Sequence, residues 1–430
     1  MPVFVGKLTG VLSCLGLSVT GVVPKLRSPL TRTIASGSNL PPRQFLTSGF
    51  VTIDSAEKIE EEELPSYVAE KYYPVAIGEI LAARYQVVSK LGYGMSSTTW
   101  LCRDLDGHGF NTLKICVRDQ RPVRELAVSD HLRNASDDHF GKRLVRLILD
   151  SFEISGPDGN HTCLVYRPLG MSFTEFQSLC PDNKLPVDML RKGVQLVLIA
   201  LAFIHENDVV HTDISANNIL QGIEDTSVLR QIEEDELARP IARKILNDRQ
   251  IYFSRPVPVS AGLPVLSDFG EARVSKSNQR GDIMPGIYRA PEVILDMEWD
   301  NKVDIWSIGV MAWDMATGGH LFLAKKGGTL NDEQHLAEMV SLMGPPPPEF
   351  LQRSVKSLRY WDSEGNWKGS VPIPEQSLES RAEQYHGDDK ELFLSFLRRV
   401  LCWVPEARPS AEELAYDDFL MQPVRTDSLD

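Results

Sequence analysis

The chain has 430 residues, of which 42% are hydrophobic and 24% are charged. This composition is normal for a globular protein and excludes collagen-like, low-complexity and wholly disordered chains. Since domains usually hold about 100–200 residues, the length predicts two large folded parts with extensions. Residues 8–24 are uncharged, but Gly, Ser and Thr dilute their apolar side chains, so we predict no membrane span.

Charge is unevenly distributed along the chain. The net charge is −14, yet residues 1–53 contain five Lys and Arg and no Asp or Glu. The acidic remainder argues against direct nucleic-acid binding and leaves room for a basic protein partner. Residues 1–53 are typical of a disordered tail, which we prefer, and also of an organelle transit peptide.

The cysteines are scattered, with no C-x-x-C pair, so we predict neither a disulfide framework nor a zinc site. The six are Cys14, Cys102, Cys116, Cys163, Cys180 and Cys402. This pattern indicates reduced thiols in a cytosol-like compartment and speaks against a secretory signal.

The first predicted elements are three short β-rich runs, at residues 85–91, 98–103 and 112–117, which indicate an antiparallel meander. A helix is expected at residues 123–133. Farther along, residues 187–206 carry apolar side chains at spacings of three and four, which predicts a buried helix. We therefore expect an α+β protein, with a small antiparallel sheet followed by a larger, mainly helical part.

A glycine-rich turn joins the first two strands. Gly92 and Gly94 stand in the pattern G-x-G-x-x-S, and such glycines let backbone N–H groups approach phosphate oxygens. Taken alone, an ordinary hairpin is the commoner explanation, and a dinucleotide fingerprint is disfavoured because a strand follows the turn. In the next strand, Lys114 needs a counter-charge, for which Glu125 is the natural candidate; an edge lysine and a solvated glutamate are the alternatives.

A more specific pattern follows the buried helix, where His211, Asp213 and Asn218 form H-x-D-x-x-x-x-N. An Asp in this place can accept the hydroxyl proton of a nucleophile, and the Asn can bind a metal ion that bridges phosphates. Downstream, Asp268 begins Asp-Phe-Gly after an apolar strand, which suits a Mg²⁺ ligand.

In order and spacing, these motifs resemble those of the eukaryotic protein kinases over residues 85–420. The chain looks most like the CMGC group and, within it, the fungal type of the SR-protein kinases, which phosphorylate serines in Arg/Ser-rich splicing proteins. Thr212 in place of the usual arginine, residues 287–292, and the proline run 345–348 with residues 360–367 carry this resemblance. It implies a bilobal protein kinase fold, with a small antiparallel N-lobe sheet carrying helix αC and a mainly α-helical C-lobe.

The resemblance also implies a serine/threonine protein kinase that uses ATP and Mg²⁺. Asp213 would be the catalytic base, and Lys114, paired with Glu125, would hold the α- and β-phosphates. Asn218 and Asp268 would hold Mg²⁺, with Lys114, Asp213 and Asn218 as the catalytic set. The other implied ATP-binding residues are Leu91, Gly92, Tyr93, Gly94, Met95, Ser96, Ser97, Thr98, Thr99, Arg167 and Leu169, with Tyr166 as gatekeeper. Structural roles are implied for His211, Phe269, Gly270, Glu292, Asp304 and Arg408.

The chain departs from the kinase pattern at a few positions. Ser215 stands where such kinases generally place a lysine that touches the γ-phosphate, a loss worth on the order of 10²-fold in turnover. Glu125 follows Lys114 by only 11 residues, a shorter spacing than usual. Thr212 removes the cation that a phosphorylated activation loop would neutralise, so we predict activity without phosphorylation of residues 273–284.

An unusually long segment of 49 residues separates Asn218 from Asp268. Its acidic run, residues 233–236, predicts a solvated surface helix, and the alternative is an acidic dock for Arg-rich substrates.

Two other functional classes remain open. A pseudokinase would bind nucleotide without transferring phosphate, and Ser215 is the argument for it. A small-molecule phosphotransferase also uses H-x-D-x-x-x-x-N, but it lacks the elements found here at residues 288–292 and 304–309.

The expected layout assigns every part of the chain. It consists of a tail (1–53), an extension (54–84), an N-lobe with hinge (85–170), a C-lobe (171–420) with inserts at 221–262 and about 344–389, and a C-terminal tail (421–430). We expect a monomer that acts on protein substrates, including Arg/Ser-rich splicing factors. The expected compartment is the cytoplasm and nucleus, with mitochondria as the alternative if residues 1–53 are a transit peptide.

Overall fold

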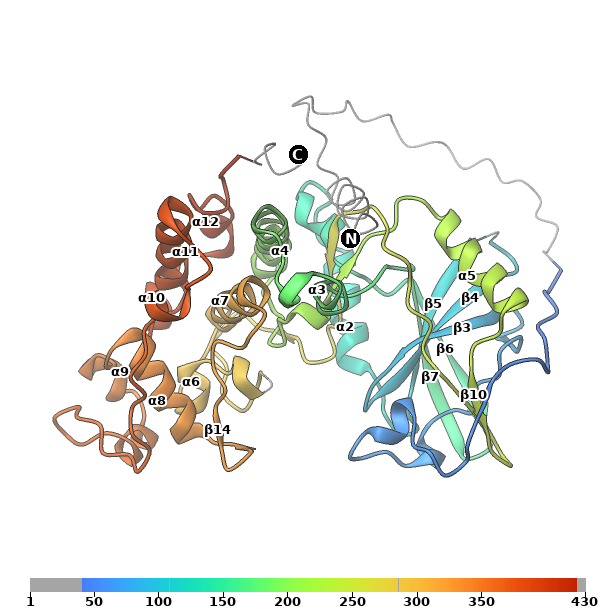
Figure 1. Cartoon of the computed structure of the whole chain (residues 1–430), viewed down its shortest axis with the longest axis horizontal. Coiled ribbons are helices and arrows are strands. Elements are labelled where there is room, and N and C mark those ends of the chain that lie inside the picture. The colour runs from blue at the N-terminus through green and yellow to red at the C-terminus, as the bar shows by residue number, and fades with distance from the viewer. Residues whose placement is uncertain (1–40, 108, 285, 424–430) are drawn as a thin grey trace. The chain divides into compact units, whose positions relative to one another are not determined.

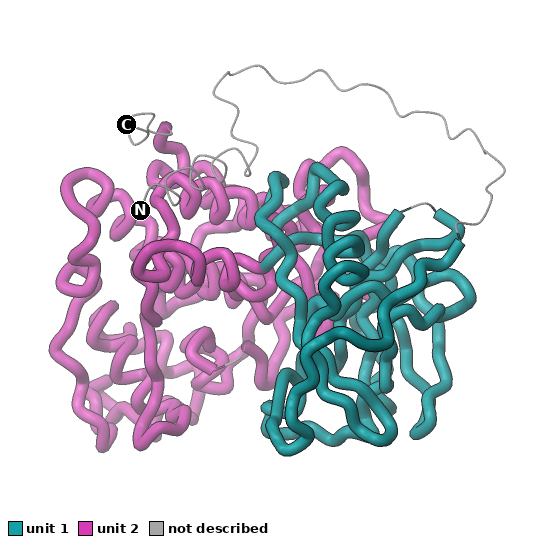
Figure 2. Tube along the Cα trace, turned by 45° about the vertical axis from the view of Figure 1, so that its right-hand side comes forward, with its two compact units in different colours: residues 1–126, 146–171, 221–263 teal, residues 127–145, 172–220, 264–430 magenta. Residues whose placement is uncertain are grey.

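The computed structural model describes residues 41–107, 109–284 and 286–423. Most of the predicted tail, and Cys14 within it, therefore lies outside the described residues. The chain forms two compact units, which are shown in different colours in Figure 2. Apart from the undescribed residues, unit 1 consists of residues 1–126, 146–171 and 221–263, and unit 2 of residues 127–145, 172–220 and 264–430.

Unit 1 is built on a six-stranded antiparallel sheet in the order β2-β3-β4-β5-β7-β6 (Figure 1). Its strands are β2 (Ile80–Leu81), β3 (Tyr85–Tyr93), β4 (Ser97–Asp104), β5 (Gly109–Cys116), β6 (Asp150–Gly156) and β7 (Gly159–Tyr166). The three strands that the sequence predicts are confirmed as β3, β4 and β5. The register sets Lys114 of β5 opposite Leu164 of β7, and Thr112 opposite Tyr166.

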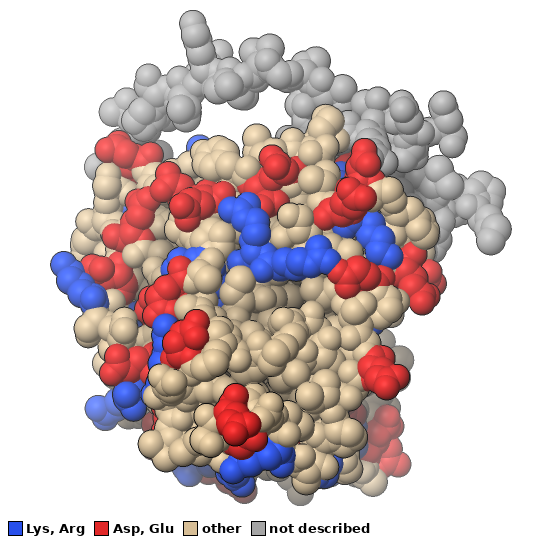
Figure 3. All heavy atoms as spheres, turned by 90° about the vertical axis from the view of Figure 1, so that its left-hand side faces the viewer, with Lys and Arg blue, Asp and Glu red and all other residues tan. Residues whose placement is uncertain are grey.

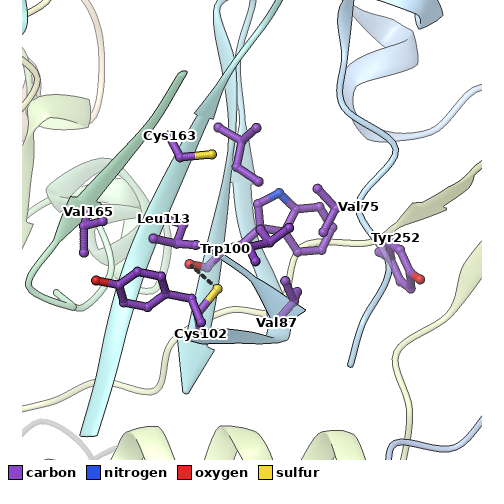
Figure 4. Packing of buried hydrophobic residues seen from close by; sticks show 11 residues of the cluster. Val75, Val87, Trp100, Cys102, Leu113, Cys163, Val165 and Tyr252 are labelled. Atoms are coloured by element: carbon purple, nitrogen blue, oxygen red, sulfur yellow. Dashed lines mark hydrogen bonds between the residues drawn. The ribbon is translucent and has the colours of Figure 1, made fainter. Parts of the chain in front are cut away.

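One face of this sheet carries an apolar core (Figure 4). Trp100 and Leu113 are register partners on β4 and β5, and both are buried. The Trp100 ring meets the Tyr252 ring edge-on at 5.7 Å. Cys102 and Cys163 belong to the same cluster, and burial raises the pKa of both thiols well above the ordinary value. The cysteines among the described residues are all free.

The N-terminal residues before the six-stranded sheet pair with the long insert, within unit 1. β1 (Thr52–Ile53) pairs in parallel with β10 (Arg243–Ile245), which pairs with β11 (Gln250–Tyr252). Two short 3-10 helices, η1 (Glu60–Glu63) and η2 (Ala69–Lys71), follow β1 in the extension. The insert also forms helix α5 (Ser227–Ala238), which lies beside β3.

Helix α5 is not the solvated surface helix that the acidic run predicts. Its Leu229 and Ile232 pack with Val88 of β3 and Leu101 of β4. Glu233 of the same helix is 2% exposed and pairs with Arg103 at 2.7 Å. The sequence interpretation counted residues 221–262 within the helical lobe, whereas these contacts group residues 221–263 with the sheet.

Unit 2 is mainly helical. Its longer helices are α2 (Val123–Arg133), whose first turn belongs to unit 1, α4 (Val187–Glu206), α7 (Lys302–Thr317), α8 (Asp332–Met343) and α11 (Gly387–Val400). Its shorter helices are α3 (Phe173–Ser178), α6 (Pro291–Ile294), α9 (Pro348–Leu351), α10 (Leu378–Arg381) and α12 (Ala411–Ala415). Its 3-10 helices are η3 (Phe140–Leu144), η4 (Pro181–Asn183), η5 (Ala216–Asn218), η6 (Gly286–Tyr288), η7 (Val355–Arg359) and η8 (Pro405–Ala407). Its short strands are β8 (Val209–Val210), β9 (Ile219–Gln221), β12 (Pro264–Leu266), β13 (Arg273–Val274), β14 (Lys325–Lys326) and β15 (Thr329–Leu330).

The helices of unit 2 follow the apolar pattern of the sequence. Helices α2 and α4 begin and end where the sequence predicts. α4 is buried along most of its length, and α7 is buried from Val303 to Ala316. The Trp306 ring of α7 stacks on Phe322 at 5.9 Å, and Trp313 stacks on Phe393 of α11 at 6.3 Å.

The face in Figure 3 mixes both signs of charge, with acidic and basic side chains interspersed over its upper part. Such a mixture is typical of a solvated protein surface. Within the described ranges, no helix combines the length and the apolar character that a bilayer crossing requires.

Candidate active site

The predicted glycine-rich loop is the hairpin that joins β3 and β4. The backbone N–H of Gly94 donates to the Ser97 carbonyl at 2.8 Å, which closes the turn. A Cβ atom added at Gly92 or Gly94 would meet no atom within 4 Å, so the backbone at both positions faces open space. A phosphate group can therefore approach the backbone of this hairpin closely on the side where other residues carry a Cβ atom.

Residues of the N-terminal extension hold this hairpin. The Tyr72 hydroxyl donates to the Gly94 carbonyl at 3.0 Å. Lys90, fully buried two residues before Gly92, donates to the Glu61 carboxylate and to the Tyr252 carbonyl at 3.1 Å. A second carboxylate, that of Glu60, lies 3.3 Å from the Lys90 ammonium. The hairpin is thus fixed by side chains that lie outside the predicted kinase motifs.

The ion pair expected between Lys114 and Glu125 is present in unit 1. The Lys114 ammonium lies 3.1 Å from Oε1 and 3.0 Å from Oε2 of Glu125, and Glu125 is 5% exposed. The short spacing between the two residues is therefore compatible with pairing. The Tyr166 hydroxyl also donates to Oε1 of Glu125.

The predicted hinge follows β7. Leu169 is buried, whereas the Arg167 side chain is exposed. The carbonyl of Arg167 accepts a hydrogen bond from Arg146 at 3.2 Å. A carbonyl oxygen has two lone pairs, so this bond leaves one acceptor position for a ligand.

The catalytic loop of unit 2 follows β8 and is held by Asp304 of α7. The fully buried Asp304 carboxylate accepts the backbone N–H groups of His211 and Thr212, each at 2.8 Å. It also lies 2.9 Å from Nε2 of His205 on α4. Thr212 has a φ of 67°, a left-handed conformation that is costly for a β-branched residue. The two bonds to Asp304 hold the loop in this strained conformation.

Asp213 and Asn218 lie side by side in the catalytic loop. The Asn218 side-chain amide donates to the backbone carbonyl and to Oδ2 of Asp213, at 2.8 and 2.9 Å. Burial raises the pKa of the Asp213 carboxyl, and the negative charges of Asp268 and Glu271 raise it further, whereas His211 and the bond from Asn218 lower it. A raised pKa is typical of carboxylates that accept protons in catalysis.

The Asp268-Phe269-Gly270 segment follows β12 and packs on the catalytic loop. The backbone N–H of Ser267 donates to the Asn218 carbonyl at 2.8 Å. The Phe269 ring lies 4.9 Å from the His211 ring, and the His211 imidazole contacts the Ser267 carbonyl at 3.1 Å. These contacts bring Asp268 and Asp213 close enough for their charges to interact.

The residues of this loop fit a magnesium ion that is shared with phosphates. Because the Nδ2 group of Asn218 is bonded to Asp213, the side-chain oxygen of Asn218 is the atom left to act as a ligand, beside the carboxylate of Asp268. Mg²⁺ prefers one or two protein oxygens together with water and substrate phosphates. Among the described residues no cluster of three or more His, Cys, Asp or Glu forms a metal site, and the proposed pair does not require one.

The ion pair expected between Glu292 and Arg408 is also present. The two side chains meet at 2.6 and 2.8 Å, and both are 1% exposed. Arg408 further donates to the carbonyl of Cys402, and its guanidinium lies over the Trp306 ring at 5.1 Å. Hydrogen bonds to every side of a buried pair offset the cost of removing its charges from water.

The predicted site residues thus form two groups, each described within its own unit. Unit 1 holds the glycine-rich hairpin, Lys114, Glu125 and the hinge, and unit 2 holds the catalytic loop and Asp268. The contributions of Tyr72, Lys90 and His205 were missed in the sequence. For Lys90 the sequence did contain a signal, since a charged residue inside the β-rich run 85–91 is unusual.

The fold and these two groups define a protein kinase. The sequence profile described as "protein kinase domain" matches residues 85–420, and the chain belongs to this family. A serine/threonine protein kinase of Aspergillus fumigatus is 43% identical over 388 residues, covering 89% of this chain and 95% of that protein.

Other similar proteins are also protein kinases. The "Serine/threonine-protein kinase SRPK" of Physarum polycephalum is 29% identical over 387 residues, covering 82% of this chain and 90% of its own. The mouse dual specificity protein kinase CLK4 is 26% identical, covering 80% of this chain and 67% of its own. A crystal structure of a kinase domain, 24% identical, matches the fold with a TM-score of 0.64 and covers 81% of this chain and 99% of its own.

Proposed function

We propose that this serine/threonine kinase phosphorylates serines in Arg/Ser-rich proteins and does so without phosphorylation of its activation loop. The observation that carries the second part is the environment of Thr212. Its hydroxyl donates to the Glu271 carbonyl at 2.9 Å, and its backbone N–H is bonded to Asp304. A neutral hydrogen bond therefore joins the catalytic loop to the segment after Gly270. Position 212 itself carries no cation that a phosphate on the activation loop would have to neutralise.

The proposed mechanism assigns a role to each group. Asp213 accepts the proton of the substrate hydroxyl as that oxygen bonds to the γ-phosphorus of ATP, while the bond from this phosphorus to the β–γ bridging oxygen breaks and ADP leaves. Asn218 orients the Asp213 carboxylate through its amide. Lys114, fixed by Glu125, holds the α- and β-phosphates of ATP, and Gly92 and Gly94 let the hairpin backbone approach these phosphates closely. A Mg²⁺ ion held by Asn218 and Asp268 would supply positive charge against the phosphate oxygens.

The proposal for Arg/Ser-rich substrates rests on the resemblance to the SR-protein kinases and on the similarity to the Physarum kinase. The acidic run at residues 233–236 gives no support to this substrate class, because it does not form an acidic dock. Glu233 and Glu236 are both at most 2% exposed and paired with arginines of unit 1, so they are not presented to a substrate. We further propose that residues 85–420 form the catalytic domain, and that the cytoplasm and nucleus are its compartments.

A transfer assay with radiolabelled ATP tests the proposal. The full chain is treated with phosphatase, checked by mass spectrometry for unmodified Ser275 and Ser277, and given either an Arg/Ser repeat peptide or the same peptide with glutamine in place of arginine. We expect transfer to the arginine peptide at least tenfold faster than to the glutamine peptide, and transfer by Asp213→Asn about 10²–10⁴-fold slower than by the wild type. Equal transfer to both peptides would overturn the substrate class, and a requirement for loop phosphorylation would overturn the second part.

Ser215 favours one competing function, a pseudokinase. Its backbone carbonyl accepts the Asn218 N–H at 3.0 Å, and its side chain makes no capping bond to η5, so the position is open to substitution. Binding of Mg·ATP without transfer to any peptide would establish this alternative. If Ser215→Lys then restored transfer, the missing cation would be the cause.

A further inference from the structure

The carboxylate of Glu125 receives hydrogen bonds from two directions within unit 1. Lys114 donates to both of its oxygens from β5, at 3.1 and 3.0 Å. The Tyr166 hydroxyl, at the end of β7, donates to Oε1 as well. The first turn of α2 is therefore attached to two strands of the sheet through one side chain.

The Tyr166 ring is held firmly in this place. The residue is 4% exposed and packs with Ile148 and Leu164 in a small apolar cluster, against which Leu126 of α2 also packs. The Arg146 guanidinium lies over the ring at 4.6 Å. Since the ring is buried among apolar side chains and covered by a guanidinium, its hydroxyl is directed at Glu125 without further ordering of the side chain.

We propose that Tyr166 is a positioning residue for phosphate transfer, because its hydroxyl holds Glu125 in the rotamer that pairs with Lys114. The inference rests on the proposed function, in which Lys114 binds the ATP phosphates. A glutamate side chain loses conformational freedom when it is ordered, and the long Lys114 side chain that pairs with it must be ordered at the same time. A second, charge-assisted bond from a rigid donor removes that freedom before ATP arrives.

The placement of α2 makes this bond consequential. Glu125 lies in the first turn of an 11-residue helix, and isolated helices of this length are marginal. In the catalytic loop, Thr212 provides no cation for a phosphorylated activation loop to bind. Tyr166 thus gives the kinase a permanent means of holding Glu125, which agrees with activity that needs no loop phosphorylation.

The test compares Tyr166→Phe with the full-length wild type in calorimetric titrations of Mg·ATP and of adenosine. The substitution removes the hydroxyl and keeps the ring. We expect the Kd for Mg·ATP to rise about three- to tenfold and the Kd for adenosine to stay unchanged, because adenosine has no phosphates for Lys114 to bind. Tyr252→Phe is the matched control, since Tyr252 is another buried tyrosine of unit 1 whose hydroxyl bonds Gln250 at 3.0 Å.

A double-mutant cycle with Glu125→Gln tests whether the hydroxyl acts through the carboxylate. In the Glu125→Gln background, we expect Tyr166→Phe to have less than a twofold effect on ATP affinity. Equal effects in both backgrounds, an unchanged Kd for ATP in Tyr166→Phe, or a parallel loss of adenosine affinity would overturn the proposal. If the wild type binds Mg·ATP but transfers no phosphate, the proposed function fails, while these binding data still decide the role of Tyr166.

Discussion

In unit 1, the Lys90 ammonium before the glycine-rich hairpin is fully buried between the carboxylates of Glu60 and Glu61. In unit 2, the Asp213 carboxylate of the catalytic loop faces the like charges of Asp268 and Glu271. Opposite charges thus stabilise the fold where the hairpin is attached, whereas like charges gather where phosphate chemistry is proposed. The region around Lys90 therefore contributes to stability, whereas the region around Asp213 is arranged for reaction. A preorganised site of the second kind often costs stability.

The largest effect is expected from Asp213→Asn, which removes the proposed base and retains an acceptor for Asn218. The rate of phosphate transfer should fall by about 10²–10⁴-fold, the usual contribution of a general base. Because the variant also removes a carboxylate with a raised pKa, its thermal midpoint at pH 7 should be higher than that of the wild type. Transfer assays and calorimetric melting check the two effects.

The higher thermal midpoint of Asp213→Asn should depend on pH, because the pKa of Asp213 is raised in the folded protein. The folded protein retains the Asp213 proton to a higher pH than the unfolded chain, so the wild type loses stability as pH rises through the raised pKa. The advantage of Asp213→Asn should therefore be complete above that pKa and vanish as pH falls toward the unfolded value of about 3.9. Asp225→Asn is the opposite control, because the Ser227 hydroxyl lowers the pKa of Asp225. A midpoint for Asp213→Asn below that of the wild type would contradict the comparison.

An intermediate effect is expected from Lys90→Met, which leaves the Glu60 and Glu61 carboxylates facing each other without their cation. Removing one partner of a buried ion pair usually costs about 3–5 kcal/mol, and we expect this loss in urea denaturation of the full chain. Adding Glu60→Gln and Glu61→Gln should recover part of the loss. Lys71→Met, at an exposed lysine of the same extension, should change the free energy of unfolding by less than about 0.5 kcal/mol. Equal effects of the two lysine substitutions would refute the proposed importance of charge pairing.

The smallest effect is expected from Tyr72→Phe, which removes the bond to the Gly94 carbonyl and nothing else. A neutral hydrogen bond contributes about 0.5–1.5 kcal/mol, so the KM for ATP should rise about two- to tenfold with little change in the midpoint of unfolding. Steady-state kinetics at varied ATP measure this change. Tyr416→Phe, at a tyrosine that is 70% exposed, is the control. An equal rise of the KM for ATP in this variant would contradict the role of the Tyr72 hydroxyl.

The sequence predicted the elements that depend on local pattern. Residues 187–206 carry an apolar stripe long enough to define a helix, and α4 has these bounds. The contacts of Asp304 and of the Glu292–Arg408 pair belong to motifs whose order along the chain implied them. These features were accessible because the spacing of residues within an element, or the order of signatures, contains the information.

The insert and the extension could not be predicted in the same way. Composition describes residues 233–236 as a charged run, and charged runs are usually solvated. The burial of Glu236 depends on Arg243 and Arg255, which lie farther along the insert, and that of Glu233 depends on Arg103 of β4. Such pairing between distant segments leaves no periodic signal in the sequence. The bond from Tyr166 to Glu125 was missed for the same reason.

The parallel pairing of β1 with β10 also has a consequence during synthesis. Thr52 pairs with Arg243, so the partner of β1 emerges from the ribosome only after about 190 further residues have been made. At roughly 5–20 residues per second, this interval lasts about 10–40 s. Throughout it, the carboxylates of η1 can reach Lys90 but have no β10 and β11 to pack against. The hairpin that is proposed to cover ATP therefore acquires its final support late, when most of the insert has been translated.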